Sequence, residues 1–151
     1  MTLAIFDLDN TLLDGDSDHA WGQFLIDHGI VDGERYRQRN DAFYRDYEAG
    51  KLDIEDFLAF ALEPLAINPY ERLEELRRAF MAETIESMIS PAAEALIKRH
   101  RNNGDTLLII TATNRFVTEP IAERLGIPHL IATEPEVKDG QFTGRVTGTP
   151  C

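Results

Sequence analysis

Three short segments have the pattern of β-strands. Residues 3–6, which end at Asp7, and residues 106–111 are apolar runs typical of strands buried on both faces, and residues 129–132 are expected to form a third short strand. Strands with both faces covered occur mainly in parallel sheets flanked by helices. The runs therefore predict a parallel sheet.

Between the first and second runs, the spacing of apolar residues changes to that of amphipathic helices. Trp21, Phe24 and Leu25 follow the i, i+3, i+4 spacing, and similar spacing recurs in residues 57–65 and 73–85. Each of these stretches presents one apolar stripe on a helix of 3.6 residues per turn. A long helical block therefore separates the first two strands.

The C-terminal part of the chain predicts a further helix and a hairpin. Residues 116–125 have helical spacing, and we expect Pro120 in the first turn of that helix, where proline is tolerated. Residues 137–146 have the pattern of a β-hairpin that turns at Asp139-Gly140.

The order of the predicted elements is strand, helical block, helix, strand, helix, strand and hairpin, which predicts an α/β fold with right-handed crossovers. The block at residues 16–85 is longer than one crossover needs, so we expect an α-helical cap inserted into a core made of residues 1–15 and 86–151. Asp7 and Thr111 end the first two strands and should meet at the carboxyl edge of the sheet, where such folds place their sites.

Composition narrows the classes of partner. The chain has 151 residues, with 27 acidic residues against 15 basic ones and a net charge of −12. This balance argues against nucleic acid, whose phosphates are bound by clusters of lysine and arginine. An acidic enzyme with an anionic substrate needs a local positive centre, which a metal ion supplies.

The location of the protein is constrained by cysteine content and hydropathy. Cys151 is the only cysteine, which excludes an internal disulfide and is typical of a reducing compartment. The N-terminus lacks the pattern of a signal peptide, and no apolar run approaches the ~20 residues that span a membrane. We therefore expect a cytoplasmic protein without a membrane partner.

Two carboxylates, Asp7 and Asp9, follow the first buried strand. By themselves they have two explanations: an ordinary exit from a strand, where aspartate is a common turn residue, or a site for Mg²⁺, which prefers hard oxygen ligands. With a cation present, one carboxylate can attack phosphorus as a covalent nucleophile. The other can protonate the leaving oxygen and later activate water.

Residues 5–13, in which Asp-Leu-Asp-Asn-Thr follows an apolar strand, resemble the DxDxT signature of haloacid dehalogenase superfamily phosphatases. The resemblance implies a Rossmann-like core and Mg²⁺ held by Asp7 and Asp9. It also implies that Asp7 is the nucleophile and that Asp9 is the general acid and base, with its backbone carbonyl on Mg²⁺. Thr11 would steady the loop.

Thr111 closes the second apolar strand, as the second motif of that superfamily requires, and the resemblance implies that it hydrogen-bonds the phosphoryl group. The residues that follow lead into a helix N-terminus, whose free N–H groups favour anions. We therefore take Ala112, Asn114 and Arg115 as candidate substrate-binding residues. Arg115 either reaches a phosphate or is merely solvated, and the sequence leaves both open.

The resemblance is closest to the phosphoserine phosphatase-like branch with a helical-bundle cap, and within it to a histidinol-phosphatase-like group. Asp16 falls where phosphoserine phosphatases carry an acid that contacts the substrate amine, although it is equally well placed to cap a helix. The cap arginine that binds the carboxylate of phosphoserine has no counterpart, because residues 57–62 are apolar. This favours an amino-alcohol phosphate over phosphoserine.

The sequence ends just past the hairpin, where the superfamily's lysine and later acids should begin. We therefore expect a core truncated at its C-terminus. The predicted function is a Mg-dependent phosphomonoester hydrolase acting through an aspartyl-phosphate on a small phosphorylated metabolite, such as histidinol phosphate. The alternatives are a phosphoserine phosphatase and a non-catalytic relic that serves as a binding module.

Overall fold

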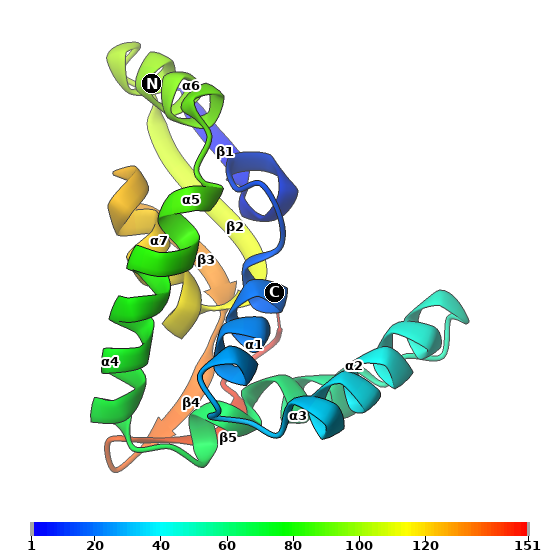
Figure 1. Cartoon of the computed structure of the whole chain (residues 1–151). Helices are drawn as coiled ribbons and strands as arrows, with labels where there is room; N and C mark the ends of the chain where they lie inside the picture. Colours follow the sequence, from blue (N-terminus) through cyan, green and yellow to red (C-terminus); the bar gives the residue numbers. More distant parts are fainter. Residues whose placement is uncertain (1, 151) are drawn as a thin grey trace.

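The computed structural model describes residues 2–150 and has a parallel three-stranded sheet at its centre (Figure 1). The strands are β1 (Leu3–Asp7), β2 (Thr106–Asn114) and β3 (His129–Thr133), hydrogen-bonded in the order β1-β2-β3. Leu3 pairs with Thr106, and Leu108 pairs with His129. The predicted Rossmann-like α/β fold is confirmed, with β2 three residues longer than its apolar run.

Between β1 and β2 the chain is mainly helical. The insertion contains α1 (Ser17–Asp27), α2 (Gly33–Glu48), α3 (Ile54–Ala66) and α4 (Tyr70–Phe80), and α4 continues through η2 (Met81–Ile85) and α5 (Glu86–Met88). After it come α6 (Pro91–Asn102) and α7 (Arg115–Leu125). Side chains that accept backbone N–H groups begin five of these helices, namely Asp16, Asp32, Asp53, Ser90 and Asn114. No helix between residues 2 and 150 has the length and apolar character needed to cross a membrane.

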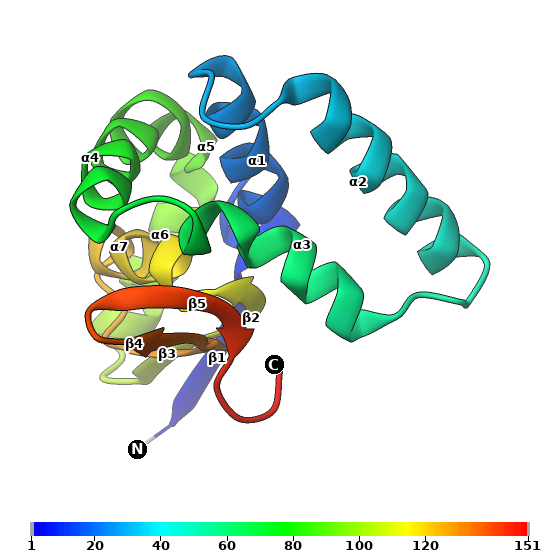
Figure 2. The same cartoon turned by 90° about the horizontal axis from the view of Figure 1, so that it is seen from below.

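Both crossover helices, α6 and α7, lie on one face of the sheet because successive right-handed connections run in the same direction along the strand order. Helices α1 and η2 pack on α7 and extend this layer. Helices α2 and α3 project away from it as a pair (Figures 1 and 2). The core is therefore continuous from the sheet into α1 and α4, and includes Phe6, Trp21 and Phe80.

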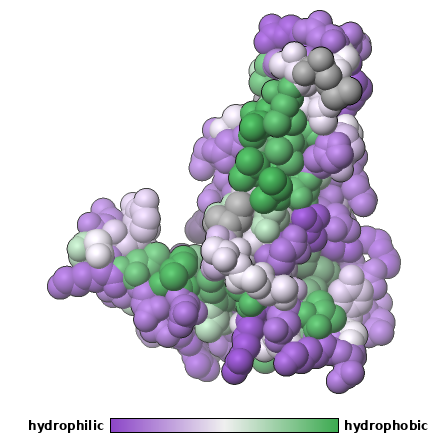
Figure 3. Space-filling view, turned by 180° about the vertical axis from the view of Figure 1, so that it is seen from behind, coloured by the Kyte–Doolittle hydropathy of each residue, from purple (hydrophilic) through white to green (hydrophobic). Residues whose placement is uncertain are grey.

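The opposite face of the sheet is uncovered within residues 2–150. Figure 3 shows an apolar strip over this face. Exposed apolar side chains come from all three strands, namely Leu3 and Ile5 of β1, Ile110 of β2 and Ile131 of β3, and Ile110 pairs with Ile131. Parallel strands usually have both faces covered, which is why their sequences are apolar throughout.

The two connections between the sheet and the helical insertion run side by side. Leu13 forms an antiparallel bridge with Ile89, and the N–H of Asp14 donates to the carbonyl of Met88 at 2.8 Å. The predicted boundary between residues 85 and 86 falls inside a continuous helical stretch, since Ile85 and Glu86 both have helical backbone angles. The division into core and cap remains a prediction.

Pro120 lies outside the first turn of its helix, although its sequence position suggested that turn. Helix α7 begins earlier, at Arg115, because the side chain of Asn114 accepts the N–H of Val117 and caps it. Pro120 lies in the second turn and has no N–H to give to the carbonyl of Phe116. Arg77 of α4 donates to that carbonyl instead, at 2.8 Å.

The predicted hairpin is confirmed. Strands β4 (Pro135–Lys138) and β5 (Gln141–Val146) are antiparallel and turn at Asp139 and Gly140, whose φ angles of 53° and 76° are those of a two-residue hairpin turn. The side chain of Gln141 donates to the carbonyls of Leu65 and Asn68. These bonds fix the hairpin beneath the C-terminal end of α3 (Figure 2).

Candidate active site

Asp9 lies in a tight loop that follows β1. Leu8 and Leu12, both almost fully buried, anchor the loop on the core, while Asp9 itself has extended backbone angles and Asn10 has a φ of 60°. The N–H of Asn10 donates to the carbonyl of Gly15 at 2.9 Å, which closes the loop. This conformation places the Asp9 side chain between the end of β2 and the start of α1.

The Asp9 carboxylate is held by four hydrogen bonds. One oxygen accepts from the N–H and the hydroxyl of Ser17, at 2.7 and 2.6 Å, at the N-terminus of α1. The other accepts from the hydroxyls of Thr113 at 3.0 Å and Thr111 at 3.3 Å. One oxygen is therefore fixed by α1 and the other by β2.

Asp7 and Thr111 were predicted to lie at the same edge of the sheet, where the Thr111 hydroxyl reaches Asp9, but Ser17 and Thr113 were not recognised from the sequence. Both are buried, and both hydroxyls point at the same carboxylate. Thr113 follows Thr111 by two residues and therefore shares its face of the strand, which is a signal that the sequence contained. Ser17 had only the general signal of a polar residue at the start of a helix.

Asp7 lies at the end of β1 with an exposed side chain. Among residues 2–150 nothing donates a hydrogen bond to its carboxylate, so its oxygens are available to a ligand. Within the same residues no three His, Cys, Asp or Glu side chains form a cluster that could hold a metal. Two oxygen atoms could serve as metal ligands, one from the Asp7 carboxylate and one from the Asp9 carbonyl. Both are hard oxygens of the kind that hold Mg²⁺ together with several waters. They fit a partial Mg²⁺ site.

A cavity of about 200 Å³ lies between Asp9 and helix α3. Its acidic wall consists of Asp9, Asp16 and Asp18. The other residues around it come from α3, the end of β2 and the end of β3: Phe57, Leu58, Ala61, Leu62, Ala112, Thr113, Asn114 and Thr133. None of these residues is a lysine or arginine, so the cavity has acidic and apolar walls but no cation.

Only some of the other predicted substrate-binding residues lie at the cavity. Ala112, Asn114 and Asp16 line the cavity, although Asn114 caps α7 and Asp16 accepts the N–H of His19 at 2.9 Å. The Thr11 side chain is exposed and makes no hydrogen bond among residues 2–150. Asp16 therefore occupies both positions that the sequence left open, at a helix cap and at the cavity.

Arg115 is not brought to the cavity. Its guanidinium donates to the carboxylate of Glu134 at 2.6 Å and to the carbonyl of Leu130 at 2.8 Å, and lies 3.7 Å from Glu119. Of the two possibilities for Arg115, contact with phosphate or an ordinary surface role, this geometry favours the second.

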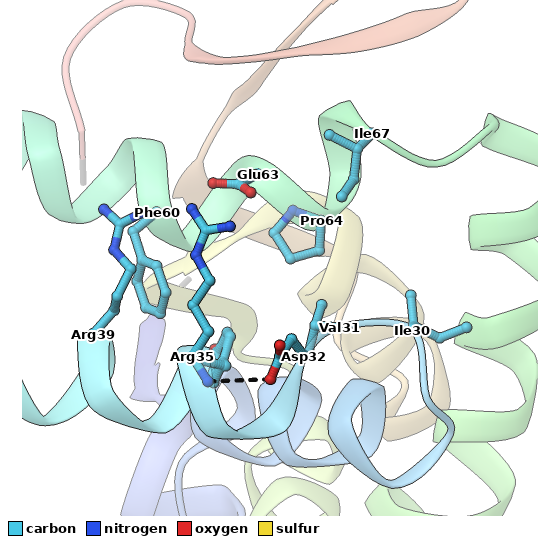
Figure 4. Close-up of a pocket in the computed structure, with 10 residues that line it drawn as sticks. Ile30, Val31, Asp32, Arg35, Arg39, Phe60, Glu63, Pro64 and Ile67 are labelled. Atoms are coloured by element: carbon cyan, nitrogen blue, oxygen red, sulfur yellow. Dashed lines mark hydrogen bonds between the residues drawn. The ribbon is translucent and has the colours of Figure 1, made fainter.

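The arginines of the cap lie on a different face of α3. Figure 4 shows Arg35 and Arg39 of α2 beside a separate cavity, near Phe60, Glu63 and Pro64. The guanidinium of Arg39 lies over the ring of Phe60, 5.1 Å from its centroid. Neither arginine lines the cavity at Asp9.

Asp18 is partly buried at the start of α1, and the sequence gave no reason to single it out from Asp14 and Asp16. Burial, followed by repulsion from Asp16 and Asp9, raises the pKa of the Asp18 carboxyl from 3.8 to about 7. Burial, followed by the charge of Asp18, also raises the pKa of the nearby Tyr36 hydroxyl to about 12. The folded protein therefore disfavours a charge at Asp18.

This shift predicts a pH-dependent effect of Asp18→Asn on stability. Between pH 4 and pH 7 the folded state keeps a proton at Asp18 that the unfolded chain releases, so the free energy of unfolding falls as pH rises through this range. We expect Asp18→Asn to raise it at pH 8, by on the order of 2 kcal/mol after allowance for partial exposure, and to have little effect below pH 4. Urea titrations in EDTA at pH 4, 6 and 8 measure this. A variant less stable than the unchanged chain at pH 8 contradicts it.

The sequence model of the haloacid dehalogenase-like hydrolases matches residues 4–151. The chain belongs to this family. A histidinol-phosphatase of Neisseria meningitidis serogroup C is 49% identical over 149 residues, which are 98% of the chain and 67% of that enzyme. The chain spans about half the length of several other relatives, including the phosphoserine phosphatase SerB1 of Mycobacterium tuberculosis, which is 30% identical over 96% of the chain and 48% of its own length.

Two solved structures of similar fold match nearly the whole chain. A protein of unknown function from Bordetella pertussis Tohama I superposes with a TM-score of 0.93 and 42% identity, over 99% of the chain and 69% of that protein. A phospho-aspartyl intermediate analogue of phosphoserine phosphatase superposes with a TM-score of 0.62 and 25% identity, over 97% of the chain and 63% of that enzyme. Both superpositions cover nearly the whole chain, which therefore has the fold of these proteins.

Proposed function

We propose that the protein is a Mg-dependent phosphomonoester hydrolase that acts on a small phosphorylated metabolite through an aspartyl-phosphate at Asp7. The observation that carries this proposal is the pair of unlike carboxylates after β1. Asp9 is fixed by four hydrogen bonds, whereas Asp7 accepts none among residues 2–150. A fixed carboxylate suits proton transfer, and a free one suits nucleophilic attack.

In the first step, an oxygen of Asp7 attacks phosphorus and forms the acyl-phosphate bond while the ester P–O bond breaks. Asp9 in its protonated form gives its proton to the leaving alcohol. In the second step, Asp9 takes a proton from water as that water attacks the phosphorus, which releases phosphate and restores Asp7. The Asp7 carboxylate and the Asp9 carbonyl would hold Mg²⁺, which would supply positive charge near the phosphoryl oxygens when bound.

The hydrogen bonds around Asp9 keep it in position for both proton transfers. Ser17 and Thr113 hold opposite oxygens of the carboxylate, so its plane is fixed without the substrate. Thr111, whose hydroxyl also reaches Asp9 in the free protein, is the proposed donor to the phosphoryl group. Ser17 and Thr113 would continue to orient the Asp9 carboxyl group when Thr111 turns to the phosphoryl group.

For the substrate, we propose histidinol phosphate in preference to phosphoserine. Support comes from the 49% identity to the Neisseria histidinol-phosphatase and from the walls of the cavity at Asp9, which contain no cationic residue. A buried carboxylate such as that of phosphoserine needs a cationic partner. The chain spans only part of the length of its relatives, so the activity of the whole protein is itself part of this proposal. Cytoplasm, predicted from the single cysteine, remains the proposed location.

Phosphate release tests the proposal. We expect an extended protein, in which the part of the Neisseria relative without a counterpart is added to the chain, to hydrolyse histidinol phosphate in Mg²⁺. The rate in EDTA should be at least about a hundredfold lower, because a bound cation contributes several kcal/mol to the transition state. The chain itself is assayed in parallel. A higher kcat/KM for phosphoserine contradicts the substrate assignment, and no release by either protein indicates a relic.

A further inference from the structure

Three acidic side chains line the cavity at Asp9, and they differ in their hydrogen bonds. Asp9 accepts four hydrogen bonds, and Asp16 accepts the N–H of His19 as the cap of α1. Asp18 accepts none from residues 2–150, although it is partly buried while Asp16 is exposed. Asp18 is thus the carboxylate in the cavity whose bonding is incomplete.

The surroundings of Asp18 do not supply a cation. Facing it across the cavity are apolar side chains of α3, Phe57, Leu58, Ala61 and Leu62. Arg35 and Arg39 line the separate cavity on another face of α3 (Figure 4). An ionised carboxylate without a partner is destabilised by the loss of its hydration, so a ligand that brings positive charge into this cavity gains the interaction that the protein does not provide.

Tyr36 of α2 lies close enough to Asp18 for its hydroxyl to feel the charge of that carboxylate. Its hydroxyl lies over Gly22, one turn after Asp18 on α1, where a Cβ atom would be only 2.3 Å from the tyrosine oxygen. The absence of a side chain at Gly22 therefore lets α2 approach α1 closely. The charge of Asp18 is felt by the Tyr36 hydroxyl, yet no hydrogen bond joins the two side chains.

Burial and the neighbouring acids raise the pKa of Asp18 to about 7. A position that is more favourable without its charge is expensive for folding, and such costs are typical of residues kept for binding or catalysis. Asp16, by contrast, already has a structural reason to be present as a helix cap.

We propose that Asp18 determines the substrate class of the site, selecting phosphomonoesters whose alcohol carries an ammonium or other cationic group that pairs with its carboxylate. This rests on the proposed phosphatase activity and shifts the recognition of the amine from Asp16, the sequence-based candidate, to Asp18. The cation lies beside the apolar wall of α3, and the phosphoryl group lies toward Asp7 and Asp9. Asp18 positions the substrate and takes no part in bond making.

Two pairs of substrates isolate the charge. Aminoethyl phosphate and propyl phosphate differ by ammonium against methyl, as do aminopropyl phosphate and butyl phosphate. In the extended protein we expect Asp18→Asn to lower the ratio of kcat/KM between the cationic and the neutral ester by at least about tenfold, mainly through KM, because a hydrogen-bonded charge is lost. Asp18→Glu should restore part of the ratio.

Matched variants control for general effects on the acidic surface. Asp14→Asn changes an exposed acid of the same loop that does not line the cavity, and it should leave the ratio unchanged. Asp16→Asn keeps a capping side chain, since asparagine caps helices as well as aspartate, and it should lower the ratio less than Asp18→Asn. A ratio that falls with Asp16→Asn but not with Asp18→Asn overturns the proposal.

A binding measurement on the 151-residue chain does not depend on turnover. Aminopropanol, but not butanol, should shift the amide NMR signals of residues around Asp18, and Asp18→Asn should abolish the shifts. Equal shifts in the variant overturn the assignment of Asp18. If the extended protein hydrolyses neither cationic nor neutral ester, the proposed phosphatase function fails, whereas hydrolysis of both with an unchanged ratio in Asp18→Asn means that only the present inference is wrong.

Discussion

Asp7→Asn should lower the kcat of the extended protein by about a thousandfold or more, since it removes the nucleophile of a covalent mechanism. An asparagine amide is a poor nucleophile and cannot form the acyl-phosphate. The variant should fold normally because the Asp7 side chain is exposed and accepts no hydrogen bond among residues 2–150. Steady-state phosphate release, with circular dichroism to verify folding, measures both effects.

The control for Asp7→Asn is Asp14→Asn, which alters an exposed carboxylate nearby but outside the proposed chemistry. Its kcat should be within about twofold of the unchanged protein, as expected for a surface substitution. Beryllofluoride, which mimics a phosphoryl group on a carboxylate, should bind the unchanged protein and not the Asp7 variant. Near-normal phosphate release by Asp7→Asn would falsify the assignment of the nucleophile.

Phe80→Ala should lower the free energy of unfolding of the chain by about 3–5 kcal/mol, the usual cost of removing a fully buried aromatic side chain. Phe80 is 0% exposed at the end of α4, and its ring packs against Trp21 and Phe24 of α1, with centroid distances of 5.1 and 5.5 Å. These contacts join α4 to α1, the first helix of the insertion. The cavity left by alanine should therefore weaken the attachment of the insertion to the sheet.

Urea titration followed by fluorescence of Trp21, the only tryptophan, measures this loss directly. Tyr44→Ala on α2 is the matched control, because Tyr44 is 62% exposed and should change stability by no more than about 0.5 kcal/mol. Phe80→Leu should fall between the two and keeps the test readable if the alanine variant does not fold. Equal stability of Phe80→Ala and Tyr44→Ala contradicts the proposed packing.

Much of the fold could be predicted because strong local patterns decide it. The three segments predicted as strands became the three parallel strands, and Asp139-Gly140 formed the expected turn. The position of Pro120 within α7 was wrong: Asn114 caps a helix that begins at Arg115, so Pro120 lies in the second turn and not the first. The preference of proline for a first turn is overridden when another donor, here Arg77, serves the carbonyl that proline leaves free.

The sequence indicated the residues of the candidate site that belong to short motifs. It did not indicate those that come to the site only through the fold. Asp9 was recognised through the DxDxT motif and Thr111 by its place at the end of an apolar run, and a hydrogen bond joins their side chains. Ser17 and Asp18 have no local signature, because their positions at Asp9 and at the cavity follow from the direction in which α1 leaves the loop. Arg115 looked suitable beside a helix N-terminus, but Glu134 on the chain after β3 pairs with it, and sequence spacing does not reveal such a partner.

The contact between Arg77 and the carbonyl of Phe116 also has an evolutionary consequence. As long as proline occupies position 120, the carbonyl needs a donor from outside its own helix, because a buried backbone group without a partner is costly. Any residue other than proline at position 120 would donate its own N–H to the Phe116 carbonyl, which would then no longer need a hydrogen bond from Arg77. Across homologous sequences, Arg77 and Pro120 should therefore be replaced together more often than either is replaced alone.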